Sequence, residues 1–476
     1  LHLDRVPLKY KGLDPWQILV SESQERMTAS VEPKKLEEFM KLAKKHEVEA
    51  TVLGKLNFSG KFYSLYNNKP VTFMDMKFVH EDLIQMELEA EWITPGVRGL
   101  KEPKIPGIKN HAKFLKDILS RPNISSKEYI VRQFDHEVQG TSVIKHLVGE
   151  ESDVYSDGVV IRPDFESEKA IAIAAGINPK YSQIDTYHMT ANALDEAIRR
   201  IIALGGNLER IVLNDNFCWP SPLPRKDNPD AKYRMAQLVR ANRALYEYTI
   251  AYGTPCISGK DSMSMDATIS DIYGKEHRVS SLPTIMFSSA GIIDDYRKCV
   301  TMDVKNPGDL VFVLGNTYDE CGGSEYYEMF GAIGLNVSVV RAKKAVKLYK
   351  DLSEAINKRL IASSHGCYKG GLGVALAQIS FAGGYGLEID LTSVPRENLE
   401  DEDKIFYSES ASRYVVTVPK KHEKNFRRIM KGNDFGLVGK VTDGKTFTVK
   451  GLNGKVILKE NIYVLKEAWK KPFGKI

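Results

Sequence analysis

The sequence predicts a layered α+β fold, in which helices pack on the faces of β-sheets. One observation predicts this fold class, and a second indicates how the chain is organised. Short apolar, β-branched runs alternate with long amphipathic segments from about residue 110 onward, which is the pattern of strands and helices that share a core. A polar signature also occurs twice, as SESQERM at residues 21–27 and as SESASRY at residues 408–414. The second observation indicates a duplicated unit.

The duplication extends well beyond the signature. VEPKKLEEFMKLAKKHEVEATVLGKL follows the first copy and VPKKHEKNFRRIMKGNDFGLVGKV follows the second, and both predict a strand, a basic amphipathic helix and a strand. The offset is 387 residues at the first serine (408 − 21) and at the helix phenylalanine (426 − 39), and 385 at a later glycine (439 − 54). Such a steady offset is typical of a repeat with short indels. Residues 21–54 are called here the first SES segment, and residues 408–439 the second SES segment.

Between the two SES segments, helices and strands are expected to alternate. MTANALDEAIRRIIALGGN predicts a helix with Leu194, Ile198 and Ile201 on one face, which ends at Gly205-Gly206. IVLND predicts a buried strand, AKYRMAQLVRANRALYEYTIAYG a long helix, and LPTIMFSSAGII another buried strand. GDLVFVLG and KKAVKLYKDLSEAINKRLI then predict a strand and a helix of a further unit.

These patterns predict four regions. Residues 1–94 hold the first SES segment, residues 95–115 are a linker rich in Pro and Gly, and residues 116–306 and 307–476 form two further units. About a hundred residues of its own unit precede the second SES segment, whereas almost none precede the first. We therefore expect the beginning of the first unit to lie in a longer parent protein or in a separate chain that docks here.

Composition excludes several classes of function. The net charge is +5, and the 67 basic residues are spread along helices without a dense block, so we expect no nucleic-acid partner. Five cysteines without a CxxC pair indicate neither a disulfide framework nor a zinc site. No apolar run approaches the length of a membrane span, and the first residues contain no signal-peptide core. We expect a cytoplasmic protein that is neither exported nor embedded in a membrane.

Two stretches combine glycine or a strand end with polar groups. SGKDSMSMD, residues 258–266, has a glycine that admits a ligand near the backbone, then a lysine and hydroxyls. A P-loop is excluded because Thr254 stands where its first glycine belongs, and because a helix precedes the stretch and a strand-like run follows it. A plain glycine turn is the favoured interpretation. VLNDNFCWPSP places Asp215 and Asn216 just after a buried strand, where either a ligand site or a turn cap is expected.

Three further stretches have a structural and a functional interpretation. HGCYKGG, residues 365–371, predicts a glycine-rich entry to a helix, and a nucleophilic cysteine is the weaker alternative. CGGSEYYEMFG, residues 321–331, predicts a helix whose N-terminus could hold an anion. In SESQERM, Glu22, Gln24 and Arg26 alternate along an expected strand, which gives either a solvated edge or a polar cleft.

Taken together, SESQERM, NISSKEYIVRQFDHEVQG, NDNFCWPSP, SGKDSMSM and CGGSEYY resemble the phosphoribosylformylglycinamidine synthase family of the aminoimidazole-ribonucleotide synthetase superfamily. The resemblance covers essentially the whole chain. It implies tandem A domains, whose sheets pair into a central barrel, and B domains that are α/β sandwiches. Residues 1–94 then correspond to the end of the first B domain, residues 116–306 to the second A domain, and residues 307–476 to the second B domain.

The resemblance also implies an activity. The family uses ATP and Mg²⁺ to activate the formamide oxygen of formylglycinamide ribonucleotide, and ammonia from a glutaminase subunit or domain displaces it to give the amidine. The implied substrate contacts are Glu22, Ser23, Gln24 and Ser262. The implied ATP-binding residues are Asp215, Gly259 and Lys260.

Two departures from the family pattern affect these expectations. Lys260 stands where smaller members have an asparagine metal ligand, and an ammonium cannot ligate Mg²⁺ although it can contact a phosphate. The family's catalytic histidine and most of its metal-binding carboxylates belong to a motif of the form N-H-N-H-P, which this sequence lacks. We therefore expect no catalytic residue here, and an N-terminal half as a partner that supplies it.

A second, noncatalytic nucleotide pocket is also implied, in a degenerate form. Asp157 and Glu196 stand at two of its metal positions, whereas Arg200, Gly366 and Lys369 replace expected ligands. By Coulomb's law, the positive side chains of Arg200 and Lys369 would weaken the binding of a divalent cation in this pocket. Pairing of Arg200 and Lys369 with the two carboxylates would close the pocket.

Two other functions stay open at this point. The chain could be a homodimeric relative that acts as an ATP-dependent kinase or synthetase on another substrate, although no glycine-rich, acidic nucleotide loop is visible in its A-type region. It could also be a noncatalytic scaffold for the glutaminase.

Overall fold

The computed structural model describes residues 1–81, 85–135 and 137–474 of the chain. It consists of two compact units, Leu1–Glu87 and Leu88–Ile476. Short 3₁₀ helices occur in both units, at Leu3–Arg5, Pro33–Lys35, Pro179–Gln183, Leu208–Arg210, Tyr296–Lys298, Leu391–Ser393, Lys420–His422 and Lys471–Phe473. Among the described residues, no helix combines the length and the apolar character that crossing a membrane requires.

The first unit contains little regular structure. Its helices are α1 (Pro15–Val20), α2 (Leu36–Lys45) and α3 (Met76–His80), and its strands are β1 (Lys61–Tyr66) and β2 (Lys69–Asp75). The strands form an antiparallel hairpin through Asn67 and Asn68, which both have positive φ, as tight two-residue hairpin turns require. Of the described apolar side chains in this unit, only Leu3 and Ile18 are buried. The unit therefore has a very small core.

The second unit begins with an extended strap that runs to α4 (His111–Leu119). Glu102 of this strap accepts hydrogen bonds from the Tyr327 hydroxyl (2.6 Å) and the Leu335 amide (2.7 Å). The Ile108 amide donates to Asp403 (2.8 Å). The strap thus lies against its unit through specific hydrogen bonds.

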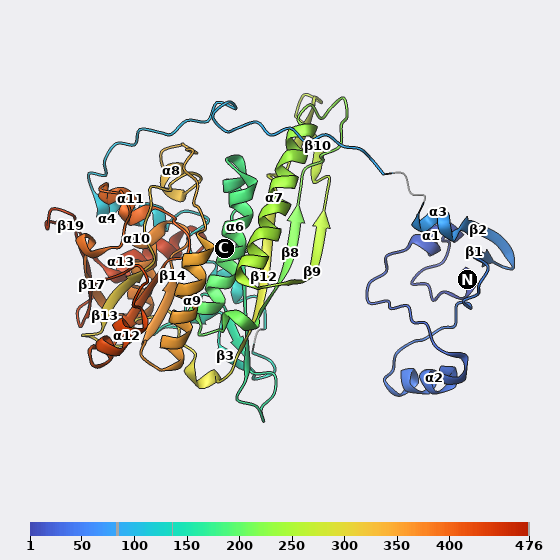
Figure 1. Cartoon of the computed structure of the whole chain (residues 1–476), viewed down its shortest axis with the longest axis horizontal. Coiled ribbons are helices and arrows are strands. Elements are labelled where there is room, and N and C mark those ends of the chain that lie inside the picture. The colour runs from blue at the N-terminus through green and yellow to red at the C-terminus, as the bar shows by residue number, and fades with distance from the viewer. Residues whose placement is uncertain (82–84, 136, 475–476) are drawn as a thin grey trace. The chain divides into compact units, whose positions relative to one another are not determined.

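A six-stranded sheet forms the first layer of this unit, in the order β3-β6-β7-β12-β8-β9. The strands are β3 (Ser142–Ile144), β6 (Val159–Ile161), β7 (Ala170–Ile177), β8 (Ile211–Cys218), β9 (Cys256–Ser262) and β12 (Thr284–Ile293). Helices α6 (Thr186–Ala203) and α7 (Ala231–Tyr252) lie side by side, and α6 contacts β7 and β12 (Figure 1). Side chains on β7 and β12 alternate between buried and partly exposed, so the helices cover one face.

A seven-stranded sheet forms the second layer, in the order β14-β16-β13-β17-β15-β18-β19. The strands are β13 (Leu310–Leu314), β14 (Ser363–Gly366), β15 (Gly386–Asp390), β16 (Tyr414–Val418), β17 (Phe435–Thr442), β18 (Thr446–Lys450) and β19 (Val456–Asn461). Its helices are α8 (Glu325–Glu328), α9 (Ala342–Asn357), α10 (Gly371–Gly383), α11 (Glu402–Tyr407), α12 (Glu423–Ile429) and α13 (Ile462–Lys470). Helix α6 contacts β14 and α9 as well as the first sheet, so it joins the two layers.

Smaller elements complete the second unit: α5 (Glu128–Val131), a two-stranded pairing of β4 (Leu147–Val148) with β5 (Val154–Tyr155), and a hairpin of β10 (Asp266–Ser270) with β11 (Glu276–Ser280). The layered α+β fold is confirmed. The helix expected to end at Gly205-Gly206 is α6, and the long helix before Gly253 is α7, whose left-handed C-terminal glycine ends it.

The elements expected in the two SES segments are only partly present. The second SES segment has β16, α12 and β17, as predicted. The first has α2, but residues 21–32 and 46–54 form no strand, so the two strands predicted there are wrong. A strand needs a neighbour to satisfy its backbone groups. In the described part of the first unit, β1 and β2 pair only with each other.

Candidate functional site

Parallel pairing of β8 with β9 brings two of the sequence-predicted residues together. Asp215 and Gly259 are register partners, and a Cβ atom on Gly259 would lie 2.9 Å from an Asp215 carboxylate oxygen. Any larger residue would displace the carboxylate, so glycine is required. The favoured turn at SGKDS was wrong, because residues 258–262 belong to strand β9. Asp215 was expected after its strand but lies within β8.

Lys260 and Ser262 lie on the other side of the sheet from Asp215, because side chains alternate along a strand. The Lys260 ammonium donates a hydrogen bond to the Ser262 hydroxyl at 3.1 Å. Lys260 is exposed, and it pairs in register with Asn216 of β8. The structure therefore separates the predicted nucleotide-binding residues into Asp215 with Gly259 on one face and Lys260 with Ser262 on the other.

The carboxyl group of Asp215 is in an unusual electrostatic setting. Partial burial raises its pKa, and the negative charge of Asp261 adds to the shift. Burial also raises the pKa of the neighbouring Cys256 thiol to about 12, with a further contribution from Asp215. The thiol stays protonated at neutral pH, so this cysteine is not a nucleophile.

The opening loop of the first SES segment is exposed. The Ser21 and Ser23 hydroxyls lie 3.1 Å apart, Arg26 donates to the Ser21 carbonyl, and Glu25 has a φ of +63°. Glu22, Ser23 and Gln24, the predicted substrate contacts, are all exposed. Their side chains are thus free to meet a ligand, and their roles remain predictions.

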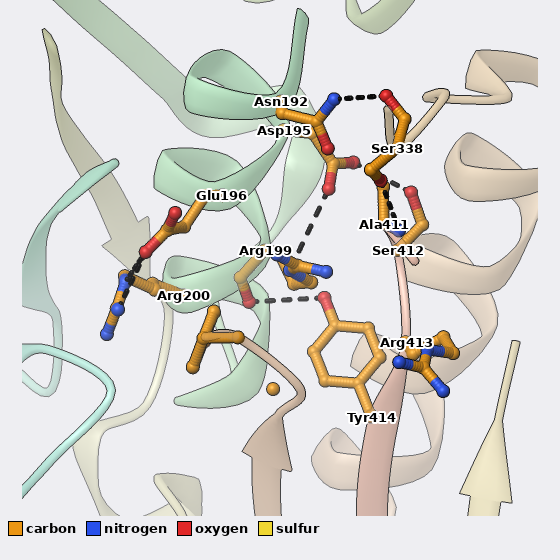
Figure 2. Close-up of polar contacts among 12 residues, drawn as sticks. Asn192, Asp195, Glu196, Arg199, Arg200, Ser338, Ala411, Ser412, Arg413 and Tyr414 are labelled. Carbon is orange, nitrogen blue, oxygen red and sulfur yellow. Dashed lines mark hydrogen bonds and ion pairs between the residues drawn. The ribbon is translucent and has the colours of Figure 1, made fainter. Parts of the chain in front are cut away.

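The second SES segment has the same loop geometry but is buried. The Ser408 and Ser410 hydroxyls lie 2.9 Å apart, Arg413 donates to the Ser408 carbonyl, and Ser412 has a φ of +57°. The Ser412 hydroxyl donates to Asp195 of α6 at 2.9 Å, and the Ala411 amide donates to Ser338 (Figure 2). This copy is therefore part of the contact between the two layers.

The carboxyl group of Glu409 in the second SES segment lies at the N-termini of two helices. Its oxygens accept hydrogen bonds from the Gly370 amide (2.8 Å), the Glu325 amide (2.9 Å) and the Tyr181 hydroxyl (3.0 Å). Gly370 and Glu325 stand at the N-termini of α10 and α8. The N-terminus in CGGSEYY that could hold an anion thus faces a carboxyl group of its own chain. Sequence reasoning missed this role, although the Ser-Glu-Ser motif marked the residue.

The carboxylates of the degenerate second pocket are paired within the protein. Arg200 donates to Glu196 at 2.7 Å (Figure 2), as the sequence suggested. Asp157 instead accepts hydrogen bonds from His365 (2.8 Å) and Tyr368 (2.5 Å), and Lys369 donates to the Asn178 side chain (3.1 Å). Burial acts to raise the pKa of both carboxyl groups, but interactions with His365 lower that of Asp157, and interactions with Arg200 and Lys369 lower that of Glu196.

The remaining predictions concern cysteines and metals. Cys367 follows β14 and precedes α10, yet it is buried, and burial raises its thiol pKa. The glycine-rich helix entry at Gly370-Gly371 is confirmed, and the nucleophile alternative has no support. Within residues 1–81, 85–135 and 137–474, no group of three or more His, Cys, Asp or Glu side chains is placed to hold a metal ion.

Family models match most of the chain. The model of the AIR synthase related protein C-terminal domain matches residues 1–66 and 306–451. The model of the FGAR-AT PurM_N-like domain matches residues 126–291. One model thus matches both the region of the first SES segment and that of the second.

Curated relatives are about 30% identical to the chain over the aligned residues. Phosphoribosylformylglycinamidine synthase subunit PurL of Methanocaldococcus jannaschii is 30% identical over 479 residues, which cover 100% of this chain and 61% of the relative. The subunit of Thermococcus sibiricus is 28% identical over 93% of this chain and 57% of its own length. The chain therefore spans about 60% of the length of these relatives.

Solved structures show a similar fold. The chain is similar to Thermotoga maritima PurL complexed with FGAR, with a TM-score of 0.54 and 18% identity over 74% of this chain and 53% of that one. For the same protein complexed with ADP, the TM-score is 0.53 and the identity 16%, over 75% and 52% of the two chains.

Proposed function

We propose that the chain, which is similar to PurL subunits of phosphoribosylformylglycinamidine synthase over its full length, is a member of that family and forms one wall of the enzyme's active site. The reaction would convert formylglycinamide ribonucleotide and ammonia into the amidine, in purine biosynthesis. ATP would supply the phosphoryl group that makes the formamide oxygen a leaving group. The chain's own residues would bind and orient the substrates.

We assign residues 1–94 to the end of a first B-type domain, 95–115 to a linker, 116–306 to a second A-type domain and 307–476 to a second B-type domain. The matching of one family model to two separate segments supports a tandem duplication. The loop geometry shared by the two SES segments supports it further.

One observation carries the proposal: the six-stranded sheet has an open face. Helices α6 and α7 cover the opposite face, while Ile173 and Ile177 of β7 are 40% and 39% exposed. A row of exposed isoleucines on a central strand costs free energy unless another surface covers it. Lys260 and Ser262 lie on this same face, at the edge strand β9. A second sheet docked there would bury the isoleucines and place these two polar groups beside the joint.

The roles of individual residues follow from their chemistry. Lys260 would contact a phosphate as a point charge, and Ser262 would donate a hydrogen bond to the substrate. Asp215 beside Gly259 would accept hydrogen bonds from the nucleotide, which the missing side chain at Gly259 admits. Glu22, Ser23 and Gln24 of the first SES segment would contact formylglycinamide ribonucleotide.

The partners would be an N-terminal half and a glutaminase subunit or domain. The N-terminal half would bring the catalytic histidine and the carboxylates for Mg²⁺, because this sequence lacks the N-H-N-H-P motif that the family resemblance implies for them. We expect the chain to lie in the cytoplasm, where the proposed nucleotide substrates occur and where cysteines such as the free ones of this chain stay reduced.

Native mass spectrometry of the chain purified with its companions from its own cells tests the proposal. We expect a complex in which one companion carries an N-H-N-H-P motif, identified by peptide sequencing. A symmetric pair of this chain without such a companion would contradict the proposal and favour the homodimeric alternative.

A further inference from the structure

A pocket of about 290 Å³ lies in the second layer, away from the open sheet face. It is formed where the carboxyl end of β13 meets the amino ends of β16 and β17, because β13 pairs with both strands in antiparallel register. The first turns of α9 form one wall, and the turn at Ala411-Ser412 forms another. The pocket is thus formed by the loops at three strand ends and by the beginning of a helix.

Positive charge dominates the lining. Arg341, Lys343, Lys344 and Lys347 line the pocket, against the single acidic side chain of Asp434. Lys344 forms an ion pair with Asp434 at 3.2 Å. Three of the four cations therefore have no counter-charge from the lining.

Two of those three cations have partners outside the lining. Arg341 pairs with Glu320 (2.8 Å) and Lys347 with Asp351 (2.6 Å). Lys343 has no ion pair or side-chain hydrogen bond to any residue that the structure describes, and it is exposed. An exposed ammonium without an ion-pair partner can bind an anion in a positive pocket without breaking an existing bond.

The charge pattern of α9 is the reverse of the usual one. Its first turn has no acidic residue and its N-cap residue, Arg341, provides no side-chain cap, so backbone amides at this end are unmatched by side chains. The positive charges of Arg341, Lys343 and Lys344 lie close to the N-terminus of α9, where the helix dipole is also positive, so the electrostatic interaction between them is unfavourable. A bound anion would offset this unfavourable interaction. Departures from the usual placement of acidic residues at helix N-termini are expected at binding sites.

We propose that this pocket binds a small phosphate-bearing metabolite, with the phosphate held by Lys343, Lys344 and the first turn of α9. A sugar phosphate fits better than a nucleotide. The one aromatic ring in the lining, that of Tyr318, is covered by the Arg341 guanidinium at 3.4 Å from its centroid. No open ring is left in the lining on which a base could stack. The site goes beyond the proposed function, since none of the residues assigned there lines it.

Isothermal titration of the full chain with ribose 5-phosphate and with inorganic phosphate, at low ionic strength, tests the proposal. We expect saturable binding of ribose 5-phosphate that weakens with added salt. Lys343→Gln should weaken binding by about threefold to tenfold, and Lys343→Gln with Lys344→Gln should abolish it. Both residues are exposed, so a change in unfolding temperature is not expected.

Lys350→Gln is the matched control. Lys350 lies on the same helix and is exposed, but it pairs with Glu209 and does not line the pocket. Its substitution should leave the affinity unchanged. Equal weakening by Lys350→Gln and Lys343→Gln would show nonspecific attraction to a basic surface and would overturn the proposal. So would the absence of saturable binding at millimolar concentrations. Tighter binding of inorganic phosphate than of ribose 5-phosphate would refute the sugar-phosphate assignment.

Discussion

The two SES segments show the same local geometry in opposite surroundings. In both, two serine hydroxyls lie close together, an arginine donates to the first serine's carbonyl, and the residue before that arginine has a positive φ. Yet Arg413 and Ser410 are completely buried, whereas Arg26 and Ser23 are exposed. Only the second segment has strands on both sides of its helix.

This contrast between the two SES segments shows which features a short sequence determines by itself and which depend on the elements packed around it. Loop geometry depends on residues within five positions of one another, so both copies form it. Strands depend on partners: β16 pairs with β13 and β14, and β17 pairs with β13 and β15. Among the residues that the structure describes, no strand pairs with the first SES segment. The first segment therefore presents to solvent the polar groups that the second segment uses internally.

The largest expected effect comes from the helix phenylalanines. Phe426 is completely buried, with ring centroids 4.9 Å from Phe312 and 6.3 Å from Phe435, whereas Phe39 is 38% exposed. Phe426→Ala should lower the free energy of unfolding by about 3–5 kcal/mol. Phe39→Ala should lower it by less than about 1 kcal/mol, because little apolar area is lost. Urea unfolding measures both, and equal losses would refute the contrast.

The arginines should differ almost as much. Arg413 donates to the Thr317 hydroxyl at 2.7 Å and to two carbonyls of its own loop. Arg413→Ala leaves these acceptors buried without a donor and should cost about 3 kcal/mol in unfolding free energy. Arg26→Ala should change it by less than about 0.5 kcal/mol, as is usual for exposed positions. A stability loss of similar size at Arg26 would show that the first loop is also part of a core.

A smaller effect is expected in the pH dependence of stability. Burial raises the pKa of Glu409 above its usual 4.5, so the folded state keeps a proton at pH values where the unfolded chain has released it. The stability from this group is complete below pH 4.5 and is lost as the pH rises through the folded pKa. Glu409→Gln removes this pH-dependent contribution to the free energy of unfolding, because the amide does not titrate.

Unfolding free energies measured by urea titration from pH 4 to 8 test this prediction. The wild-type value should decline more steeply above pH 4.5 than that of Glu409→Gln. Glu22→Gln at the matched exposed position should keep the wild-type profile. Parallel curves for all three proteins would show that Glu409 does not retain its proton.

The smallest effect on stability, and the clearest on activity, is expected at Gln24. Its counterpart in the second segment is Ala411, which lacks an amide group. In the assembled enzyme, Gln24→Ala should lower kcat/KM for formylglycinamide ribonucleotide by about tenfold to a hundredfold, from lost hydrogen bonds of about 1–3 kcal/mol. The unfolding temperature should not change. An unchanged kcat/KM would remove Gln24 from the substrate site.

Sequence patterns predicted the layers and the long helices because these depend on local periodicity. Helix α6 ends before Gly205 and α7 before Gly253, as the glycines indicated. The same reasoning failed at residues 258–262, where the glycine suggested a turn and parallel pairing with β8 imposed a strand. Tertiary context overrode the local preference there.

The candidate site was predictable in composition but not in arrangement. Motifs identified Asp215, Gly259 and Lys260, yet only strand pairing shows that Lys260 lies on the opposite face from Asp215. The partners of Asp157 could not be predicted, because His365 is 208 residues away in the sequence and a sequence does not reveal which side chain lies beside a carboxylate in the fold. The basic pocket was missed for the same reason, since its walls come from four separate segments.

The degenerate second pocket provides a test of whether its two carboxylates, Asp157 and Glu196, stay paired with protein groups in solution. With Glu196 bound to Arg200, and Asp157 to His365 and Tyr368, little negative charge remains for a hard divalent ion. We expect purified protein to release far less than one adenine nucleotide per chain on denaturation, as measured by anion-exchange chromatography. Release of one nucleotide per chain would mean that these pairs open in solution.

The rate of formylglycinamidine ribonucleotide formation tests the central claim most directly. It is measured with formylglycinamide ribonucleotide, ATP, Mg²⁺ and free ammonia, first with the chain alone and then with an N-terminal half added. If the chain forms one wall of a shared active site, the chain alone gives no product above a heat-killed control, and addition of the other half restores turnover. Turnover by the chain alone would contradict the claim.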